Sequence, residues 1–258
     1  MDNSLLYEFL EEKFHLYNRP SFIESDPISI PKMFHLKEDI EIIGFLTATI
    51  SWGNRRSIIN NGHKLANYMG NSPYDFVMSF NKIAALKLKE KNFVHRTFNA
   101  DDLNYFIGAL ARIYKNEEGM EALFAKHLSK YDINMKQAII AFGEFFCSNK
   151  NVGRTSKHIA KPQENSAAKR INMYLRWMVR NDNAGVDFGL WKKISPSLLS
   201  IPLDVHSGRV ARKLGMLQRT QNDWKAVEEL DKALRKFDAN DPVKYDYALF
   251  GLGVFENF

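Results

Sequence analysis

Apolar side chains recur at helical spacing along most of the chain, and this pattern constrains the fold more than any other feature. In 4–17, Leu6, Leu10 and Phe14 follow one another every four residues, as on one face of a helix. We find no clear pair of alternating apolar runs joined by a two-residue turn, which would mark a β-hairpin. No repeat of fixed period is present, which argues against a solenoid. The sequence therefore predicts an all-α fold of many helices.

The expected helices cover residues 4–17, 37–51, 55–69, 103–115, 119–128, 135–147, 166–180, 204–216, 222–237 and 243–251. Acids at the start of 37–51 favour a helix N-terminus, and the apolar residues that follow predict burial on most sides. We expect N-caps at Asp101-Asp102 and Ser195, because short polar side chains accept bonds from free helix amides. The polar segment 148–165 is the clearest loop.

Cysteine usage narrows the possible function. Cys147 is the single cysteine, so the chain holds no internal disulfide and no four-cysteine cluster. We therefore expect neither an iron–sulfur cofactor nor a metal. The N-terminus lacks the basic start and apolar core of a secretory signal, and no run of about 18 apolar residues occurs. We therefore expect a cytoplasmic, monomeric chain without membrane contact.

Positive charge is concentrated in one part of the chain. The formal net charge is only +6, but residues 149–220 hold 14 Lys and Arg against 4 Asp and Glu. A local excess of this kind is typical of a surface that meets a polyanion. We expect residues 149–220 to form a basic block that faces nucleic acid, which would associate the chain with the nucleoid.

Two segments of this block carry candidate chemistry. The helix expected over 166–180 has a polar stripe at spacings of three and four, formed by Lys169, Asn172, Arg176 and Arg180. Downstream, I-P-L-D-V-H-S-G-R-V occupies residues 201–210. Asp204 follows Pro202 closely and is on spacing alone a helix N-cap.

The segment around Asp204 resembles the P-V-D-x-H-x-x-R-V motif of the helix-hairpin-helix DNA glycosylase superfamily, which includes endonuclease III and the 8-oxoguanine glycosylases. Residues 42–58 are similar to the buried helix of that superfamily, which ends in a polar turn that is wedged into DNA. The order of elements up to 254 also follows it. In whole-chain character the sequence further resembles a bacterial family of unknown function placed near these glycosylases. The resemblance implies one glycosylase-like unit over 1–258, with two helical lobes and a cleft between them.

The resemblance implies a catalytic carboxylate at Asp204. Val186 and Gly185 stand where a catalytic lysine usually lies, and ISPSLL replaces the usual G-x-G hairpin. The archaeal 8-oxoguanine glycosylase branch places its lysine on the preceding helix, and Lys169 lies on such a helix, 35 residues before Asp204. Lys169 is therefore the expected nucleophile, with Lys192 and Lys193 as alternatives.

These residue types suit removal of a damaged base. A carboxylate stabilises the cation-like sugar that forms when an N-glycosidic bond breaks, and a neutral lysine amine can attack the sugar and form a Schiff base. The target base must first leave the duplex. Contacts with DNA are expected from Asn54, Arg55, Arg170, Arg176, Lys192, Lys193, His206, Arg209 and Arg212.

Each candidate also has a plainer interpretation. Asn54 and Arg55 can simply end a helix, Arg209 and Arg212 can form a solvated face, and His206 can be structural. We therefore keep three hypotheses: a glycosylase, with or without lyase activity, acting on an oxidised purine such as 8-oxoguanine in double-stranded DNA; a non-catalytic nucleic-acid binder on the same scaffold; and a helical protein whose basic block meets an acidic partner.

Overall fold

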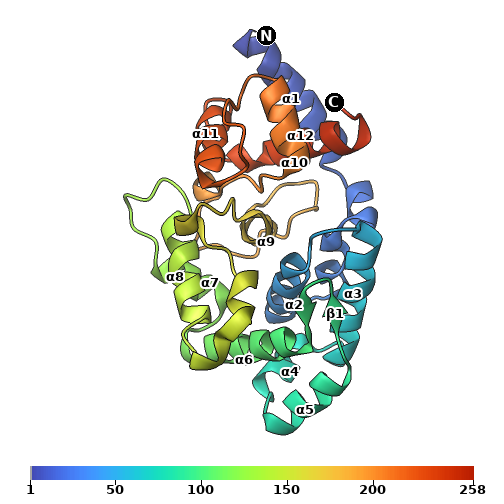
Figure 1. Cartoon of the computed structure of the whole chain (residues 1–258). Helices are drawn as coiled ribbons and strands as arrows, with labels where there is room; N and C mark the ends of the chain where they lie inside the picture. The colour runs from blue at the N-terminus through green and yellow to red at the C-terminus, as the bar shows by residue number, and fades with distance from the viewer. Residues whose placement is uncertain (1) are drawn as a thin grey trace. The chain divides into compact units, whose positions relative to one another are not determined.

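The computed structural model describes residues 2–258, which form a chain of helices (Figure 1). Helix accounts for 64% of the residues and strand for 2%, which confirms the all-α fold class. The α-helices are α1 (Asn3–Tyr17), α2 (Lys37–Thr49), α3 (Arg55–Tyr68), α4 (Pro73–Met78), α5 (Lys82–Glu90), α6 (Ala100–Asn116), α7 (Met120–Lys126), α8 (Lys136–Phe146), α9 (Lys169–Val179), α10 (Val205–Lys213), α11 (Trp224–Leu234) and α12 (Tyr245–Phe255).

Two α-helices and a pair of strands were not expected from the sequence. Helices α4 and α5 are short, at 6 and 9 residues, so neither repeats an apolar face often enough to show a period. Strands β1 (Val94–His95) and β2 (Phe98–Asn99) form a two-stranded antiparallel hairpin. Its turn places Arg96 in the left-handed region with φ of 55°, a conformation that usually takes glycine or asparagine. The missing turn signal hid the hairpin.

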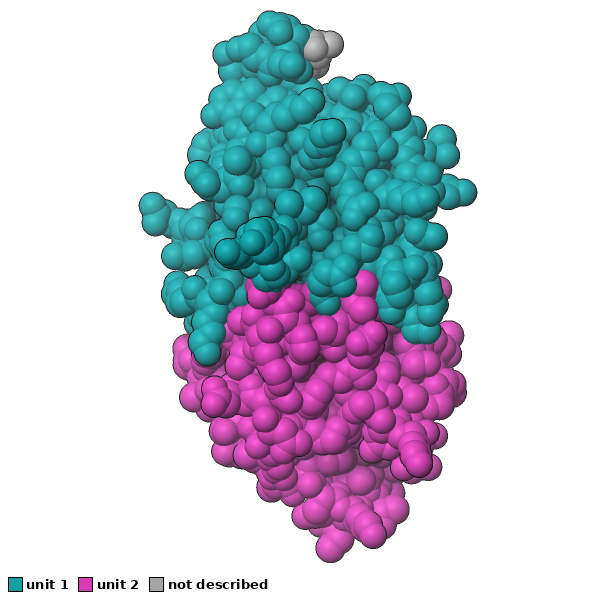
Figure 2. All heavy atoms as spheres, turned by 90° about the vertical axis from the view of Figure 1, so that its left-hand side faces the viewer, with its two compact units in different colours: residues 1–23, 129–137, 161–258 teal, residues 24–128, 138–160 magenta. Residues whose placement is uncertain are grey.

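The chain forms two compact units, coloured separately in Figure 2. Unit 1 contains residues 1–23, 129–137 and 161–258, and unit 2 contains residues 24–128 and 138–160. The expected basic block is therefore divided, because residues 149–160 belong to unit 2 and residues 161–220 to unit 1.

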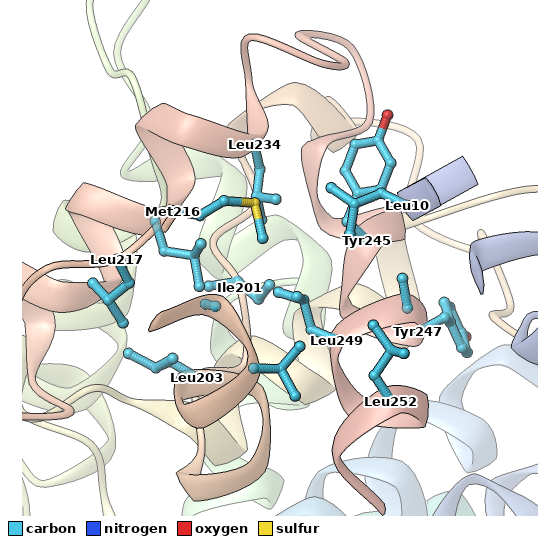
Figure 3. Close-up of a cluster of buried hydrophobic side chains, with 14 of the residues drawn as sticks. Leu10, Ile201, Leu203, Met216, Leu217, Leu234, Tyr245, Tyr247, Leu249 and Leu252 are labelled. Atoms are coloured by element: carbon cyan, nitrogen blue, oxygen red, sulfur yellow. The ribbon is translucent and has the colours of Figure 1, made fainter. Parts of the chain in front are cut away.

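Unit 1 is built around an apolar core supplied by α1, α10, α11, α12 and the segment before α10. In Figure 3, Leu249 of α12 lies close to Ile201, and Met216 lies close to Leu234. Leu203 is 1% exposed and directly precedes Asp204. Burial of Leu203 therefore anchors the start of α10 in the core.

Two glycines allow α12 to lie close to its neighbours. A Cβ on Gly251 would overlap the Tyr17 ring of α1. A Cβ on Gly253 would lie 3.0 Å from the Cβ of His206, in the first turn of α10. The glycine face of α12 thus packs against both α1 and the beginning of α10, which Asp204 precedes.

Unit 2 has its own core, centred on α2. Every residue of α2 from Ile40 to Thr49 is buried, as the apolar run 37–51 predicted. Phe45 of α2 stacks on Phe106 of α6 at a centroid distance of 5.8 Å, and Phe106 meets Phe146 of α8 edge to face. These aromatic contacts hold α2, α6 and α8 together.

Candidate functional site: a lysine–aspartate pair in unit 1

The structure brings Lys169 and Asp204 into contact within unit 1. Lys169 is the first residue of α9, and its Nζ lies 3.6 Å from Oδ2 of Asp204, which directly precedes α10. The side chains are 33% and 15% exposed, respectively. Residues 35 positions apart therefore form an ion pair that solvent can reach.

Asp204 is also the N-cap of α10, as its position after Pro202 predicted. Its Oδ1 accepts bonds from the backbone N–H of His206 at 2.8 Å and of Ser207 at 3.0 Å. The Ser207 hydroxyl in turn accepts from the Asp204 N–H at 3.0 Å, which completes a capping box. One oxygen of Asp204 is thus committed to the helix, while the other faces Lys169.

The backbone before Lys169 is unusual. Ala168 has φ of 51° and ψ of 31°, a left-handed conformation that costs an alanine on the order of 1 kcal/mol. Ala168 itself is 4% exposed, and Trp224 N–H bonds to the carbonyl of Asn165 at 3.3 Å. Packing and hydrogen bonds at this segment thus fix where α9 begins, and with it the position of Lys169.

A buried ion network lies further along α9. Arg176 pairs with Asp187 and with Asp246 of α12, and these three side chains are at most 7% exposed. Arg180 is 1% exposed and pairs with Asp187 at 3.1 Å and with Asp241 at 2.9 Å. These carboxylates raise the pKa of Arg180 further above its ordinary range, against the effect of burial. The network ties α9 to α12 and to the segment 181–190.

Asp246 is the member of this network that sequence reasoning missed. Burial raises the pKa of Asp246 from its ordinary 3.8 to about 6, while Arg176 lowers it; Asp204 raises it further and Lys169 lowers it. Asp246 therefore interacts electrostatically with both members of the exposed pair. The sequence signal was an acid within an otherwise apolar helix, Y-D-Y-A-L-F, which predicts a buried carboxyl that needs a cationic partner.

Among the expected DNA contacts, one arginine is buried and two bond to backbone carbonyls. Arg176 is 4% exposed and committed to its two aspartates, so its prediction as a DNA-contacting residue was wrong. The polar stripe on α9 faces protein rather than solvent at that position. Arg209 bonds to the carbonyl of Gly253 at 2.9 Å, and Arg212 bonds to the carbonyl of Arg219 at 2.7 Å. These two arginines satisfy backbone carbonyls with at least part of their donors.

The remaining expected contacts differ in exposure. Lys192 and Lys193 are exposed in unit 1. Arg170 is half-buried, and burial lowers the pKa of its guanidinium below its ordinary range. His206 is half-buried, and its ring lies 6.4 Å from that of Phe250.

Asn54 and Arg55 belong to unit 2, where Asn54 caps α3 through a 3.1 Å bond from the Ser57 N–H. Asn54 therefore begins a helix, in agreement with the helix expected over 55–69, and the plainer interpretation that these residues end a helix is wrong, since α2 already ends at Thr49.

The site and fold together define a class: a helical protein with a lysine–aspartate pair at two helix starts. Residues 26–255 match the family described as "Protein of unknown function (DUF2400)", and the chain belongs to that family. No curated protein and no solved structure matches the chain significantly. Among residues 2–258, no helix is long and apolar enough to cross a membrane, and no three His, Cys, Asp or Glu side chains gather as metal ligands.

Proposed function

We propose that this protein is a DNA glycosylase with lyase activity, which removes an oxidised purine such as 8-oxoguanine from double-stranded DNA. The contact between Lys169 Nζ and Asp204 Oδ2, at 3.6 Å, is the observation that carries the proposal. It places an amine next to a carboxylate where solvent, and therefore a substrate, can reach both. The sequence around Asp204 and the helical fold agree with the resemblance to helix-hairpin-helix glycosylases.

The two side chains have separate roles in the proposed reaction. Lys169 first gives one ammonium proton to solvent, and its neutral amine then attacks C1′ of the deoxyribose while the glycosidic bond breaks. The base leaves with the bonding electrons and takes up a proton from the lysine nitrogen. The C1′–O4′ bond then breaks, O4′ takes its electrons and a proton from solvent, and a protonated Schiff base joins Lys169 to C1′. Asp204 stabilises the positive charge that develops on the sugar through the oxygen that faces Lys169.

Two features of unit 1 support a duplex as the substrate. Lys192 and Lys193 are exposed and lie 12 and 11 residues before Asp204 in the chain. Cationic side chains of this kind bind phosphates without reading sequence. Residues 161–220 carry most of the basic residues of the basic block and belong to the same unit as the pair.

Borohydride trapping on a duplex with a single 8-oxoguanine tests the proposal. We expect a covalent adduct with the wild-type protein and none with Lys169→Ala. Lys232→Ala is the matched control, since it removes an exposed lysine of α11 from the same unit, outside the proposed site, and should retain the adduct. An undiminished adduct from Lys169→Ala, or none from the wild type, would contradict Lys169 as the nucleophile.

The second candidate is a non-catalytic nucleic-acid binder. The double use of Asp204 favours it, because a capping carboxylate that also pairs with a lysine is a stable structural arrangement without any reaction. Salt-dependent duplex binding without base release over a panel of lesions would support this candidate. Base release that depends on Asp204 and not on Lys169 would instead indicate a glycosylase that uses water.

A further inference from the structure

Three segments of unit 2 that contain no aspartate or glutamate meet around Trp52, in the turn between α2 and α3. The segments are residues 50–57, 94–99 and 149–158. The Trp52 ring meets the His95 ring edge to face at 5.0 Å and stacks on the His158 ring at 6.0 Å. His95 Nε2 also bonds to the Trp52 carbonyl at 3.1 Å. These contacts bring the β1–β2 hairpin and the segment after α8 to the same turn.

Leaving histidine aside, the charged side chains of these three segments are all cationic. They are Arg55, Arg56, Arg96, Lys150, Arg154 and Lys157, all of them exposed except the half-buried Arg55. A group of like charges without acids among them repels itself, and this is typical of a surface that meets a polyanion. Elsewhere in unit 2 acids accompany exposed lysines, as in the Lys89–Asp101 pair at 2.9 Å and the Lys126–Glu117 pair at 2.8 Å.

Arg96 occupies a strained backbone position at the turn of the hairpin. Its φ of 55° lies in the left-handed region, which glycine and asparagine adopt more readily than arginine. Its side chain reaches toward the turn before α3, because Nη1 lies 2.7 Å from the position that a Cβ on Gly53 would take. Among residues 2–258, Arg96 forms no ion pair. The hairpin therefore keeps a cation in a strained position without using its charge inside the fold.

Arg154 lies against the same hairpin turn. Its Nη2 donates to the Thr97 carbonyl at 2.5 Å and pairs with the buried Asp102 at 3.2 Å, while its side chain is 52% exposed. The Thr155 hydroxyl donates to the other oxygen of Asp102 at 2.8 Å, which fixes that carboxylate. One nitrogen of the Arg154 guanidinium is thus held by the protein, and its other donors lie outside these bonds. A guanidinium held in this way is preorganised to bind a phosphate.

We propose that the exposed cations around Trp52 form a surface of unit 2 that binds the sugar-phosphate backbone of a DNA duplex. This unit-2 cationic surface consists of Arg56, Arg96, Lys150, Arg154 and Lys157. It goes beyond the proposed reaction, because the Lys169–Asp204 pair belongs to unit 1. The inference rests on the proposed function only for the choice of DNA as the polyanion. Contacts of this kind hold a duplex without reading its sequence.

Binding of the full chain to a short undamaged DNA duplex, followed by fluorescence anisotropy over a range of salt concentrations, tests the surface. Arg96→Asn is the informative variant, because asparagine accepts the left-handed turn and the fold is retained. We expect its affinity to fall about threefold or more, and the slope of log K against log salt to become smaller by about 1. Lys115→Gln is the matched control and should bind as the wild type does. It removes an exposed cation of unit 2 that stands roughly 20 Å along α6 from Asp102.

Four results would overturn the inference. They are no duplex binding by the wild type, an unchanged affinity and salt slope in Arg96→Asn, an equal loss in Lys115→Gln, and competition by polyglutamate as strong as that by a DNA duplex. The last result would assign the surface to an acidic protein instead.

Borohydride trapping on the same preparations separates this inference from the proposed function. Duplex binding that depends on Arg96, without any adduct from the wild type, would leave the unit-2 cationic surface in place and remove the lyase reaction. An adduct that depends on Lys169, with duplex binding that does not depend on Arg96, would do the reverse.

Discussion

The two ends of α9 carry ion pairs of the same kind in opposite surroundings. At the start of the helix, Lys169 and Asp204 keep 33% and 15% of their side-chain exposure. At its end, Arg180 is 1% exposed and pairs with Asp187 and Asp241. Water can replace a lost partner at an exposed pair, but it cannot do so at a buried one. The start of α9 can therefore change without unfolding the protein, whereas its end cannot.

The strongest test of this difference between the two ends is to remove the buried cation, Arg180. Arg180→Met leaves the Asp187 and Asp241 carboxylates without their strongest partner in a buried place. We expect the free energy of unfolding to fall by about 3–5 kcal/mol, measured by urea denaturation. Lys193→Met, which removes an exposed cation from the same unit, is the control and should change it little. A loss below about 1 kcal/mol for Arg180→Met would contradict the structural role of the network.

The pH dependence of stability separates the two ends next. Asp246 has its pKa raised to about 6 by burial, so the folded protein binds its proton more tightly than the unfolded chain. Its contribution to stability is therefore full below about pH 4 and is lost as pH rises through about 6. We expect wild type to lose about 2–3 kcal/mol relative to Asp246→Asn between those limits, which paired urea titrations would measure. A pH-independent difference would contradict this.

A smaller effect is expected where the exposed pair meets a helix end. Asp204→Ala removes the N-cap of α10 and should lower the free energy of unfolding by about 1 kcal/mol. Asp204→Asn keeps a capping oxygen and should lower the free energy of unfolding by only a few tenths of a kcal/mol. Thermal unfolding of the two variants checks the order. If Asn were as damaging as Ala, the ion pair and not the cap would be the stabilising interaction.

The smallest effect on stability is expected for Lys169 itself. Because its pair with Asp204 is partly solvated, Lys169→Met should change the free energy of unfolding by about 0–1 kcal/mol, and less at high salt. The same substitution should abolish borohydride trapping. Denaturation and trapping measured on one preparation therefore separate a reactive lysine from a structural one. A large loss of stability would instead indicate that Lys169 has a structural role like that of Arg180.

Local signals in the sequence predicted much of the fold. Ser195 and Asp204 cap the elements that they were expected to cap, because a cap needs only its own residue and the next three. The cap of α6 was misplaced: Asn99 caps the helix, and Asp102 returns the bond as the third helical residue. Both residues have capping side chains, so the spacing alone did not choose between them.

The candidate site was predicted less evenly. The motif around Asp204 and the helix that carries Lys169 identified both members of the pair. The same helical stripe wrongly assigned Arg176 to DNA, because spacing tells which residues share a face and not what covers that face. The charge of the basic block led to the same error. Several of its arginines form ion pairs with acids or hydrogen bonds to carbonyls inside unit 1.

The sequence by itself determined the helices, most of their caps and the residue types of the site, since these depend on neighbours a few positions away. Only the tertiary structure decided which charges are exposed. Close packing of α12 at Gly251 and Gly253 places Asp246 in the interior, and folding brings Lys169 to Asp204 across 35 residues. Burial is a property of the assembled core, and in this protein it separates the buried ion pairs from the exposed pair on which the proposed reaction depends.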